Sequence, residues 1–227
     1  MTPDETGSPG RDDPDGCALC DAMATSPDAH IRSIFSPAEY PSEVLLETQR
    51  FCVLPDLAPI AVGHVLIVPR IHLRALATLS PGMTEELEEL RNDVTRILVE
   101  KLGGRVTLFE HGVCSGVSAC GIDHAHLHLV PLPDTCRLTV DPTFPAEEIS
   151  SIRSVIEIAP RQDYLLLSDR NRTHVYYPAT ATSQYFRRLI SEELGRDHWH
   201  WSDRLILGDR HALRRELQAV RRIFDRR

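Results

Sequence analysis

The chain has 227 residues, of which 42% are hydrophobic and 26% charged, the composition of a globular protein that buries a core. The net charge of −8 argues against a general nucleic-acid binder, because such proteins neutralise phosphates with basic side chains. No stretch approaches the roughly 18 consecutive apolar residues of a membrane span, and the acidic start lacks an apolar leader segment. We therefore expect no membrane association and a cytoplasmic protein whose six cysteines are mostly reduced.

The predicted elements of the first half follow an acidic, proline- and glycine-rich tail over residues 1–16, which we expect to be disordered. Ser80-Pro81 is typical of a helix start, apolar residues then recur at helical spacing, and Gly103-Gly104 ends the run, so a helix is predicted over 81–102. Short apolar runs broken by turn residues predict strands at 43–48, 51–54, 64–69, 105–110 and 125–130. A loop that contains glycine and cysteine joins the last two strands.

The second half repeats the mixture of helices and strands on a smaller scale. Weak helical spacing covers 147–156, a hairpin is predicted from 164–167 and 174–177, and helices are predicted over 182–194 and 209–224. We therefore expect an α+β protein with three parts, namely the tail (1–16), a first unit (17–135) and a C-terminal α+β extension (136–227).

The sharpest feature is the run His124-Ala-His126-Leu-His128-Leu-Val130 at the end of the first unit. Side chains on a strand alternate between faces, so histidines at a spacing of two all point the same way, while the apolar residues between them point into a core. Imidazoles on one face can bind a metal ion. They can also carry out phosphoryl chemistry, in which one imidazole attacks phosphorus and its neighbours orient it and protonate the leaving group.

This run resembles the signature of the histidine triad (HIT) superfamily of nucleotide hydrolases and transferases. The resemblance extends upstream to Asp56-Leu-Ala-Pro59 and to the block from Gly63-His64 to His72, and it covers residues 17–133. It implies a HIT-like fold, in which an antiparallel sheet is combined with one long helix. It also implies a small-molecule nucleotide as substrate, and it leaves a homodimer open.

The resemblance carries over to single residues. His126 matches the nucleophile that attacks the α-phosphate and forms a nucleotidyl-histidine intermediate, and His128 matches the residue that contacts the leaving group. Asp56 matches the carboxylate that accepts hydrogen bonds from the ribose hydroxyls, with Leu57 placed at the base. A histidine rather than a glutamine as third member favours a hydrolase. The alternatives are a nucleotidylyltransferase or phosphorylase on the same scaffold and a metal-dependent hydrolase that uses the three histidines as ligands.

The sequence departs from the family pattern ahead of the triad. Small family members have Asn-Glu-Gly there and a Ser or Thr three residues before the first histidine, and both contact the phosphate. This chain has Glu110-His111-Gly112 and Gly121 at those places. We place Glu110 and Gly121 at the substrate. A carboxylate repels a phosphate unless it holds a cation or a sugar hydroxyl, so the substrate is expected to differ from a simple nucleoside monophosphate conjugate.

A second group of residues points to a metal. Cys17-x-x-Cys20 has the spacing with which one turn supplies two zinc ligands. A redox motif of this kind would follow a strand, whereas this one follows the tail, so a metal site is favoured. Several HIT branches bind zinc through a similar set, which implies His72 and His124 as the remaining ligands of a structural zinc ion. Cys114 and Cys120 flank the loop before the triad. They are interpreted as buried small residues, with a second metal pair as the alternative.

The C-terminal extension matches no motif. Its predicted helix start carries Ser183, Gln184, Arg187 and Arg188, which can present hydroxyl, amide and guanidinium groups to a distal phosphate. A solvated helix face is the alternative. The run from His198 to Trp201 can stack on a base, but packing against the core is favoured. We expect the extension to shape the leaving-group side of the pocket.

Overall fold

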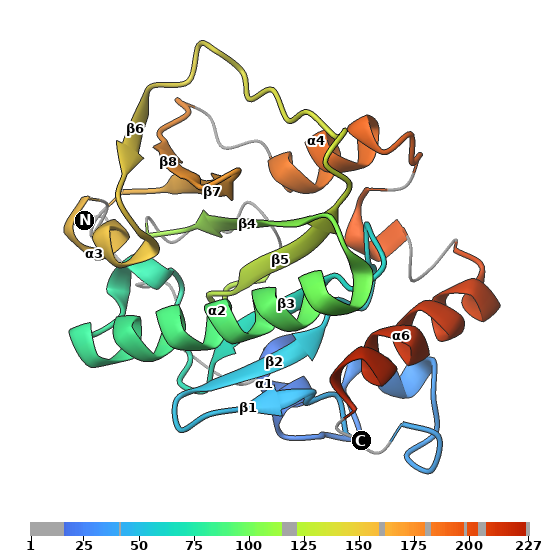
Figure 1. Ribbon diagram of the computed structural model, residues 1–227. Helices are drawn as coiled ribbons and strands as arrows, with labels where there is room; N and C mark the ends of the chain where they lie inside the picture. Colours follow the sequence, from blue (N-terminus) through green and yellow to red (C-terminus); the bar gives the residue numbers. More distant parts are fainter. Residues whose placement is uncertain are drawn as a thin grey trace, which may run out of the picture.

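The computed structural model describes residues 16–40, 42–114, 122–158, 162–179, 183–197, 199–203 and 208–225. Within these ranges, strands form one antiparallel sheet in the order β1-β2-β3-β5-β4-β7-β8-β6 (Figure 1). The strands are β1 (Leu46–Glu47), β2 (Phe51–Pro55), β3 (Val65–Pro69), β4 (Arg105–Gly112), β5 (Leu127–Leu132), β6 (Ala146–Ile149), β7 (Tyr164–Asp169) and β8 (Arg172–Tyr176). The expected antiparallel sheet is thus confirmed.

Helices pack on both faces of this sheet. The long helix α2 (Pro81–Leu102) crosses one face and packs on apolar side chains of β3, β4 and β5 (Figure 1). Two helices pack on the opposite face, α1 (Ala18–Met23) over β2 and β3, and α4 (Tyr185–Glu193) over β4, β5 and β7. Shorter pieces are η1 (His30–Ser33), η2 (Leu76–Thr78), η3 (Ile152–Ser154) and α3 (Val155–Ile158). No helix in the described ranges is both long and apolar enough to cross a lipid bilayer.

The predicted long helix is confirmed at both ends. It begins at Pro81, directly after the N-cap Ser80, and ends before Gly103, whose φ of 72° is open to glycine but unfavourable for other residues. Its buried face consists of Met83, Thr84, Leu87, Leu90, Val94 and Leu98. This stripe repeats at three- and four-residue steps, and that spacing is what made the helix predictable.

Three predictions of elements are corrected. The strand expected over 43–48 is only two residues long, and the triad strand begins at Leu127 rather than residue 125, so His124 and His126 precede it. The helix expected over 147–156 is wrong in its first part, because Ala146–Ile149 forms strand β6 along β8. The backbone hydrogen bonds that β8 offers at its edge outweigh a weak local helical preference.

The C-terminal extension continues the sheet of the first unit. Its predicted hairpin is confirmed as β7 and β8, and β7 pairs with β4 along five residues. The hairpin turn has positive φ at both Arg170 and Asn171, which matches the right-handed twist of the flanking strands. The last helix, α6 (Arg210–Phe224), returns to the N-terminal part of the chain, where Leu213 and Leu217 pack on the segment that contains η1.

Candidate active site

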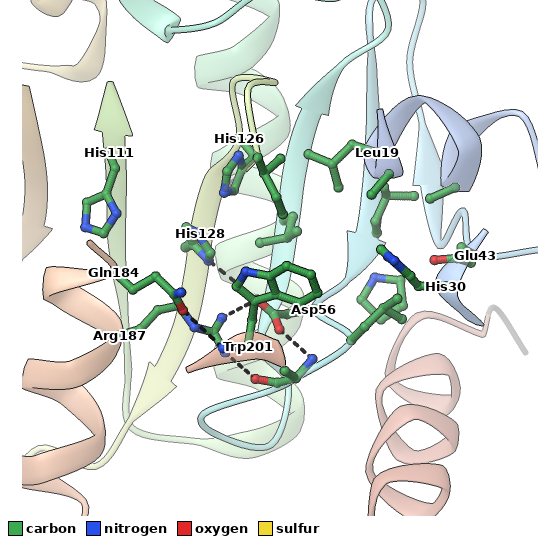
Figure 2. A pocket seen from close by; sticks show the side chains of 18 residues that line it. Leu19, His30, Glu43, Asp56, His111, His126, His128, Gln184, Arg187 and Trp201 are labelled. Atoms are coloured by element: carbon green, nitrogen blue, oxygen red, sulfur yellow. Dashed lines mark hydrogen bonds and ion pairs between the residues drawn. The ribbon is translucent and has the colours of Figure 1, made fainter. Parts of the chain in front are cut away.

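A pocket lies on the face of the sheet that α1 and α4 cover. His126 and His128 stand at its centre, Asp56 and Arg187 lie on one side of them, and the apolar residues of α1 line the far end (Figure 2). The register explains the position of His128, which pairs with Leu66 of β3 and Phe109 of β4. Alternation along each strand turns these three side chains to the same face. The Phe109 ring stacks on the His128 ring at 4.1 Å between centroids.

His126 is held by the backbone carbonyl of His124, two residues earlier in the chain. Its Nδ1 lies 2.6 Å from the carbonyl oxygen of His124, so Nδ1 carries the proton and donates it. The other ring nitrogen, Nε2, then keeps a lone pair. Because β5 begins only at Leu127, the segment before it is free to place this carbonyl under the imidazole. The arrangement fixes both the tautomer and the direction of a nucleophilic nitrogen.

His128 is held through His64, which lies just before β3. The backbone N–H of Ile60 donates to His64 Nδ1 at 3.3 Å, which leaves the His64 proton on Nε2. That nitrogen lies 2.9 Å from His128 Nδ1 and donates to it. In a neutral ring, the His128 proton must therefore sit on Nε2. His128 can then donate a hydrogen bond from Nε2.

These imidazoles are neutral at physiological pH. Burial lowers the pKa of His64 to about 4 and takes that of His128 well below its usual value. Burial also lowers the pKa of His126, although the hydrogen bond to the His124 carbonyl opposes the change. His111, on β4 beside them, has a pKa of about 3 for the same reason. A neutral His126 is the form that can attack an electrophile.

Asp56 forms a buried ion pair with Arg187 of α4. The Arg187 Nη1 donates to Asp56 Oδ2 at 2.6 Å, and Oδ1 accepts the backbone N–H of Ala58 at 2.8 Å. Arg187 also donates to the carbonyl oxygens of Ala58 and Trp199. Burial, the largest single influence, raises the pKa of Asp56, but the Arg187 guanidinium, His64 and the Ala58 backbone N–H together outweigh it and the pKa is lowered. The pocket thus contains an ionised carboxylate that its partner holds in one orientation.

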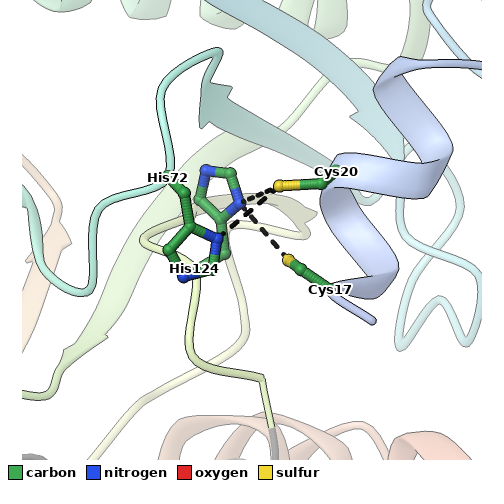
Figure 3. A group of neighbouring side chains, drawn as sticks. All are labelled: Cys17, Cys20, His72 and His124. Atoms are coloured by element: carbon green, nitrogen blue, oxygen red, sulfur yellow. Dashed lines mark hydrogen bonds between the residues drawn. The ribbon is translucent and has the colours of Figure 1, made fainter. Parts of the chain in front are cut away.

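Four potential metal ligands meet next to this pocket: Cys17, Cys20, His72 and His124 (Figure 3). Their ligand atoms all lie within 4.8 Å of one another. His124 turns Nδ1 toward both sulfurs, at 3.5 Å and 3.4 Å, and its Nε2 donates to the carbonyl of Pro69 at 2.9 Å. His72 turns Nδ1 toward Cys20 Sγ at 3.6 Å. The predicted set is thus brought together from three separate segments, with the lone pair of His124 directed into it.

The structure divides the remaining predicted site residues into two groups. Leu57 and Gln184 line the pocket together with Asp56 and Arg187. Ser183 is exposed, and Arg188 is solvent-accessible and lies 3.7 Å from Glu192 on the outer side of α4. The structure therefore brings only Gln184 and Arg187 of the predicted phosphate-binding set to the pocket. Gly121 lies outside the described residues, as does Cys120.

The placement of Glu110 at the substrate is corrected. Glu110 lies on the opposite face of β4, buried, where its carboxylate accepts hydrogen bonds from the Leu76 backbone N–H and the Tyr164 hydroxyl. Burial raises the pKa of Glu110 to about 7 despite these bonds. Strand alternation turns its neighbour His111 into the pocket instead. The expected repulsion between this carboxylate and a phosphate therefore does not arise.

Several residues of the pocket had no role predicted from the sequence. His64 and His111 could have been predicted from the sequence. His64 belongs to the motif from Gly63 to His72, and His111 is the neighbour of Glu110, which was placed at the substrate. His30 and Glu43 carried no sequence signal. Trp201, for which packing was favoured, lines the pocket with its ring 5.8 Å from that of His30.

The pocket thus combines a neutral His126 that presents a free ring nitrogen, His128 as a hydrogen-bond donor and an ionised Asp56. Comparison with known proteins agrees with this class. Residues 29–137 match the family model described as "Scavenger mRNA decapping enzyme C-term binding". The chain is 30% identical over 101 residues to adenosine 5'-monophosphoramidase HNT1 of Candida albicans, which covers 42% of this chain and 65% of that protein. It is also 30% identical over 100 residues to the asymmetrical bis(5'-nucleosyl)-tetraphosphatase of Schizosaccharomyces pombe, over 43% of this chain and 53% of that protein.

These matches support the resemblance to the histidine triad superfamily over the part of the chain that they cover. Among solved structures, a zinc-bound histidine triad family protein from Mycobacterium smegmatis is similar at 16% identity and a TM-score of 0.43, over 65% of this chain and 93% of that one. The chain spans less than two thirds of the length of each of the two curated relatives. The family match ends at residue 137, so most of the C-terminal extension lies beyond it.

Proposed function

We propose that this protein hydrolyses a nucleotide conjugate at its α-phosphorus through a covalent nucleotidyl intermediate on His126. The observation that carries the proposal is the hydrogen bond from His126 Nδ1 to the His124 carbonyl, which leaves Nε2 as the nucleophilic atom. Two relatives whose names describe nucleotide hydrolases, a monophosphoramidase and a tetraphosphatase, support hydrolysis over transfer. In the first step, His126 Nε2 forms a bond to phosphorus and the bond to the leaving group breaks with its electron pair.

His128 assists the departure of the leaving group. Its Nε2–H donates a hydrogen bond to the departing atom, which then takes a proton from solvent. A water molecule next attacks phosphorus and gives up a proton to solvent, the N–P bond breaks with its electron pair returning to His126, and a nucleoside monophosphate is released. The His124 carbonyl stabilises the positive charge on the imidazole between the two steps, because the Nδ1–H bond becomes stronger as the ring becomes cationic.

Asp56 is proposed to bind the ribose. Each of its oxygens accepts one bond from the protein and retains a lone pair for a hydroxyl of the sugar. Arg187 keeps the carboxylate ionised and fixes its plane. In this proposal Arg187 acts as a positioning residue from the C-terminal extension, rather than as a ligand of a distal phosphate.

We also propose that Cys17, Cys20, His72 and His124 hold a structural zinc ion. Tetrahedral zinc with Zn–S of about 2.3 Å and Zn–N of about 2.05 Å places sulfur and nitrogen about 3.6 Å apart. The sulfur–nitrogen distances of 3.4, 3.5 and 3.6 Å fit that value. The ion would fix His124, whose carbonyl holds His126.

Two reduced cysteines are needed for it, and the five described cysteines are thiols rather than disulfides, which supports the cytoplasm as the compartment. A homodimer stays a prediction.

The intermediate provides the test. Wild-type protein mixed with a nucleoside 5'-phosphoramidate and quenched in acid is expected to carry one nucleotidyl group on the peptide that contains His126, measured by mass spectrometry. His126→Ala should stay folded, bind nucleotide and lose turnover. His174→Ala provides the control, because His174 lies on β8 beside Glu148, outside the pocket, and full activity is expected. A His126→Ala protein that keeps more than a few per cent of the wild-type rate would exclude the mechanism.

A further inference from the structure

Glu43 lies at the end of the pocket that the proposed chemistry does not use. It precedes β1 and faces the cavity beside His30, at the end of the pocket away from His111 (Figure 2). Only 1% of this residue is exposed to solvent. A carboxyl group at such a depth usually has partners, because transfer from water to a protein interior without them is costly.

One oxygen of Glu43 has no partner. Among the described residues, Oε1 has no hydrogen-bond partner, although the atom is buried. Leaving a buried polar group unsatisfied is unfavourable, and more so for a charged one. The unsatisfied atom therefore indicates a ligand that supplies hydrogen-bond donors when it enters the pocket.

The walls around Glu43 have the shape and polarity of a site for a flat, largely apolar ring. Leu19, Ala22, Leu54 and Leu66 supply aliphatic surface, and the indole of Trp201 faces this space across from His30. Asp56, the proposed ribose ligand, lies between this region and the two catalytic histidines in the same cavity (Figure 2). A base attached to that ribose would thus extend toward Glu43.

We propose that Glu43 reads the edge of the nucleobase and selects guanine. The inference rests on the proposed function, since it assumes a nucleotide with its ribose on Asp56. Guanine presents the N1–H and the 2-amino group side by side, and the two oxygens of one carboxylate can accept both hydrogen bonds. Adenine presents an acceptor at N1 instead, which would face a carboxylate oxygen and be repelled.

The C-terminal helix holds the segment that carries Glu43. Arg221 of α6 donates to the carbonyl of Ser42 at 2.7 Å, and its guanidinium lies 4.8 Å above the Tyr40 ring. Burial raises the pKa of Glu43 to about 7, with Arg32 opposing the rise. Glu43 is therefore mostly ionised at pH 8, and two donors from guanine would favour that state further.

The test compares three substrates that differ only in the base: the 5'-phosphoramidates of guanosine, inosine and adenosine, assayed with the full chain at pH 8. Inosine keeps N1–H but lacks the 2-amino group. We expect kcat/KM to fall about tenfold from guanosine to inosine and about a hundredfold from guanosine to adenosine, as expected for one and two hydrogen bonds to a charged group. Equal values for the three bases would overturn the proposal.

A near-isosteric variant separates recognition from a structural role. Glu43→Gln should lower kcat/KM for guanosine about tenfold or more and raise it for adenosine, because the amide can donate to adenine N1 and accept from the 6-amino group. Glu47→Gln, at an exposed glutamate of β1, is the matched control and should leave all three values unchanged. A Glu43→Gln protein that loses the same factor on all three bases would show that Glu43 only supports the fold.

Failure of the proposed function has a different signature. If the wild type cleaves none of the three conjugates, the hydrolase proposal is wrong, and base selection is then measured by calorimetry with GMP, IMP and AMP. Tightest binding of GMP, lost in Glu43→Gln, supports the guanine site independently of turnover. Equal affinity for the three nucleotides refutes it.

Discussion

Replacement of Arg187 tests the most specific contact between the C-terminal extension and the site. Arg187→Met removes the guanidinium and keeps most of the aliphatic volume, which leaves the Asp56 carboxylate buried without its cation. Both side chains are almost fully buried, at 4% and 8% exposure, so water from the pocket replaces the lost partner only in part. Breaking a buried pair from one side costs about 3–5 kcal/mol. Since total stabilities are about 5–15 kcal/mol, the variant should fold but unfold at lower denaturant.

The double variant Arg187→Met/Asp56→Asn shows how much of this cost is electrostatic. Removing the carboxylate charge as well should recover about 1–3 kcal/mol relative to the sum of the single changes, the usual coupling for residues in contact. Urea unfolding of zinc-loaded protein measures each free energy, provided that the m-value stays constant. Arg188→Met is the control on the same helix, where the side chain is half exposed and a change within about 0.5 kcal/mol is expected. A loss for Arg187→Met as small as that control, or strict additivity in the double variant, would refute the buried-pair interpretation.

Two further predictions concern the metal ligands and the opposite face of the sheet. Cys17→Ser should reduce the zinc content, determined by elemental analysis, and lower the melting temperature; one zinc per chain with normal melting would exclude Cys17 as a ligand. The raised pKa of Glu110, about 7 against 4.5, means that its contribution to stability is present at low pH and lost as the pH rises from about 4.5 to 7. Glu110→Gln should remove that loss. The difference in the free energy of unfolding, variant minus wild type, should therefore be larger at pH 8 than at pH 5 by about 2–3 kcal/mol, measured by urea unfolding at the two pH values.

Local patterns predicted those parts of the fold in which a short segment carries its own signal. The helix α2 was predictable because its cap, its apolar stripe and its terminal glycine lie within one stretch of chain. The grouping of the proposed metal ligands and the triad were predictable from a resemblance whose motifs are short. The start of β5 at Leu127 was not, because it depends on the pairing of Leu127 with Ile67, a contact across 60 residues of chain.

The sheet face on which Glu110 lies and the ion-pair partner of Arg187 illustrate two different limits of prediction from the sequence. Glu110 was placed at the substrate from a motif alignment, although a strand with Leu108 on the core face must also turn Glu110 to that face. That error could be avoided by counting alternation. The contact of Arg187 with Asp56 joins residues 131 positions apart, and no local pattern marks it. Only the docking of α4 on the sheet brings the two together.

The extension therefore acts on the pocket from two sides while contributing little to the triad itself. Through α4 it supplies the cation that keeps Asp56 ionised, and through α6 it anchors the segment that carries Glu43. Its hairpin also covers the edge of β4, the strand that places Phe109 and His111. The histidines proposed to be catalytic come from the part of the chain that resembles the family, so the proposed reaction type follows from that part. The charge and hydrogen-bonding groups at the proposed ribose and base positions depend on the extension, and substrate choice should therefore follow from the part of the chain in which no motif is found.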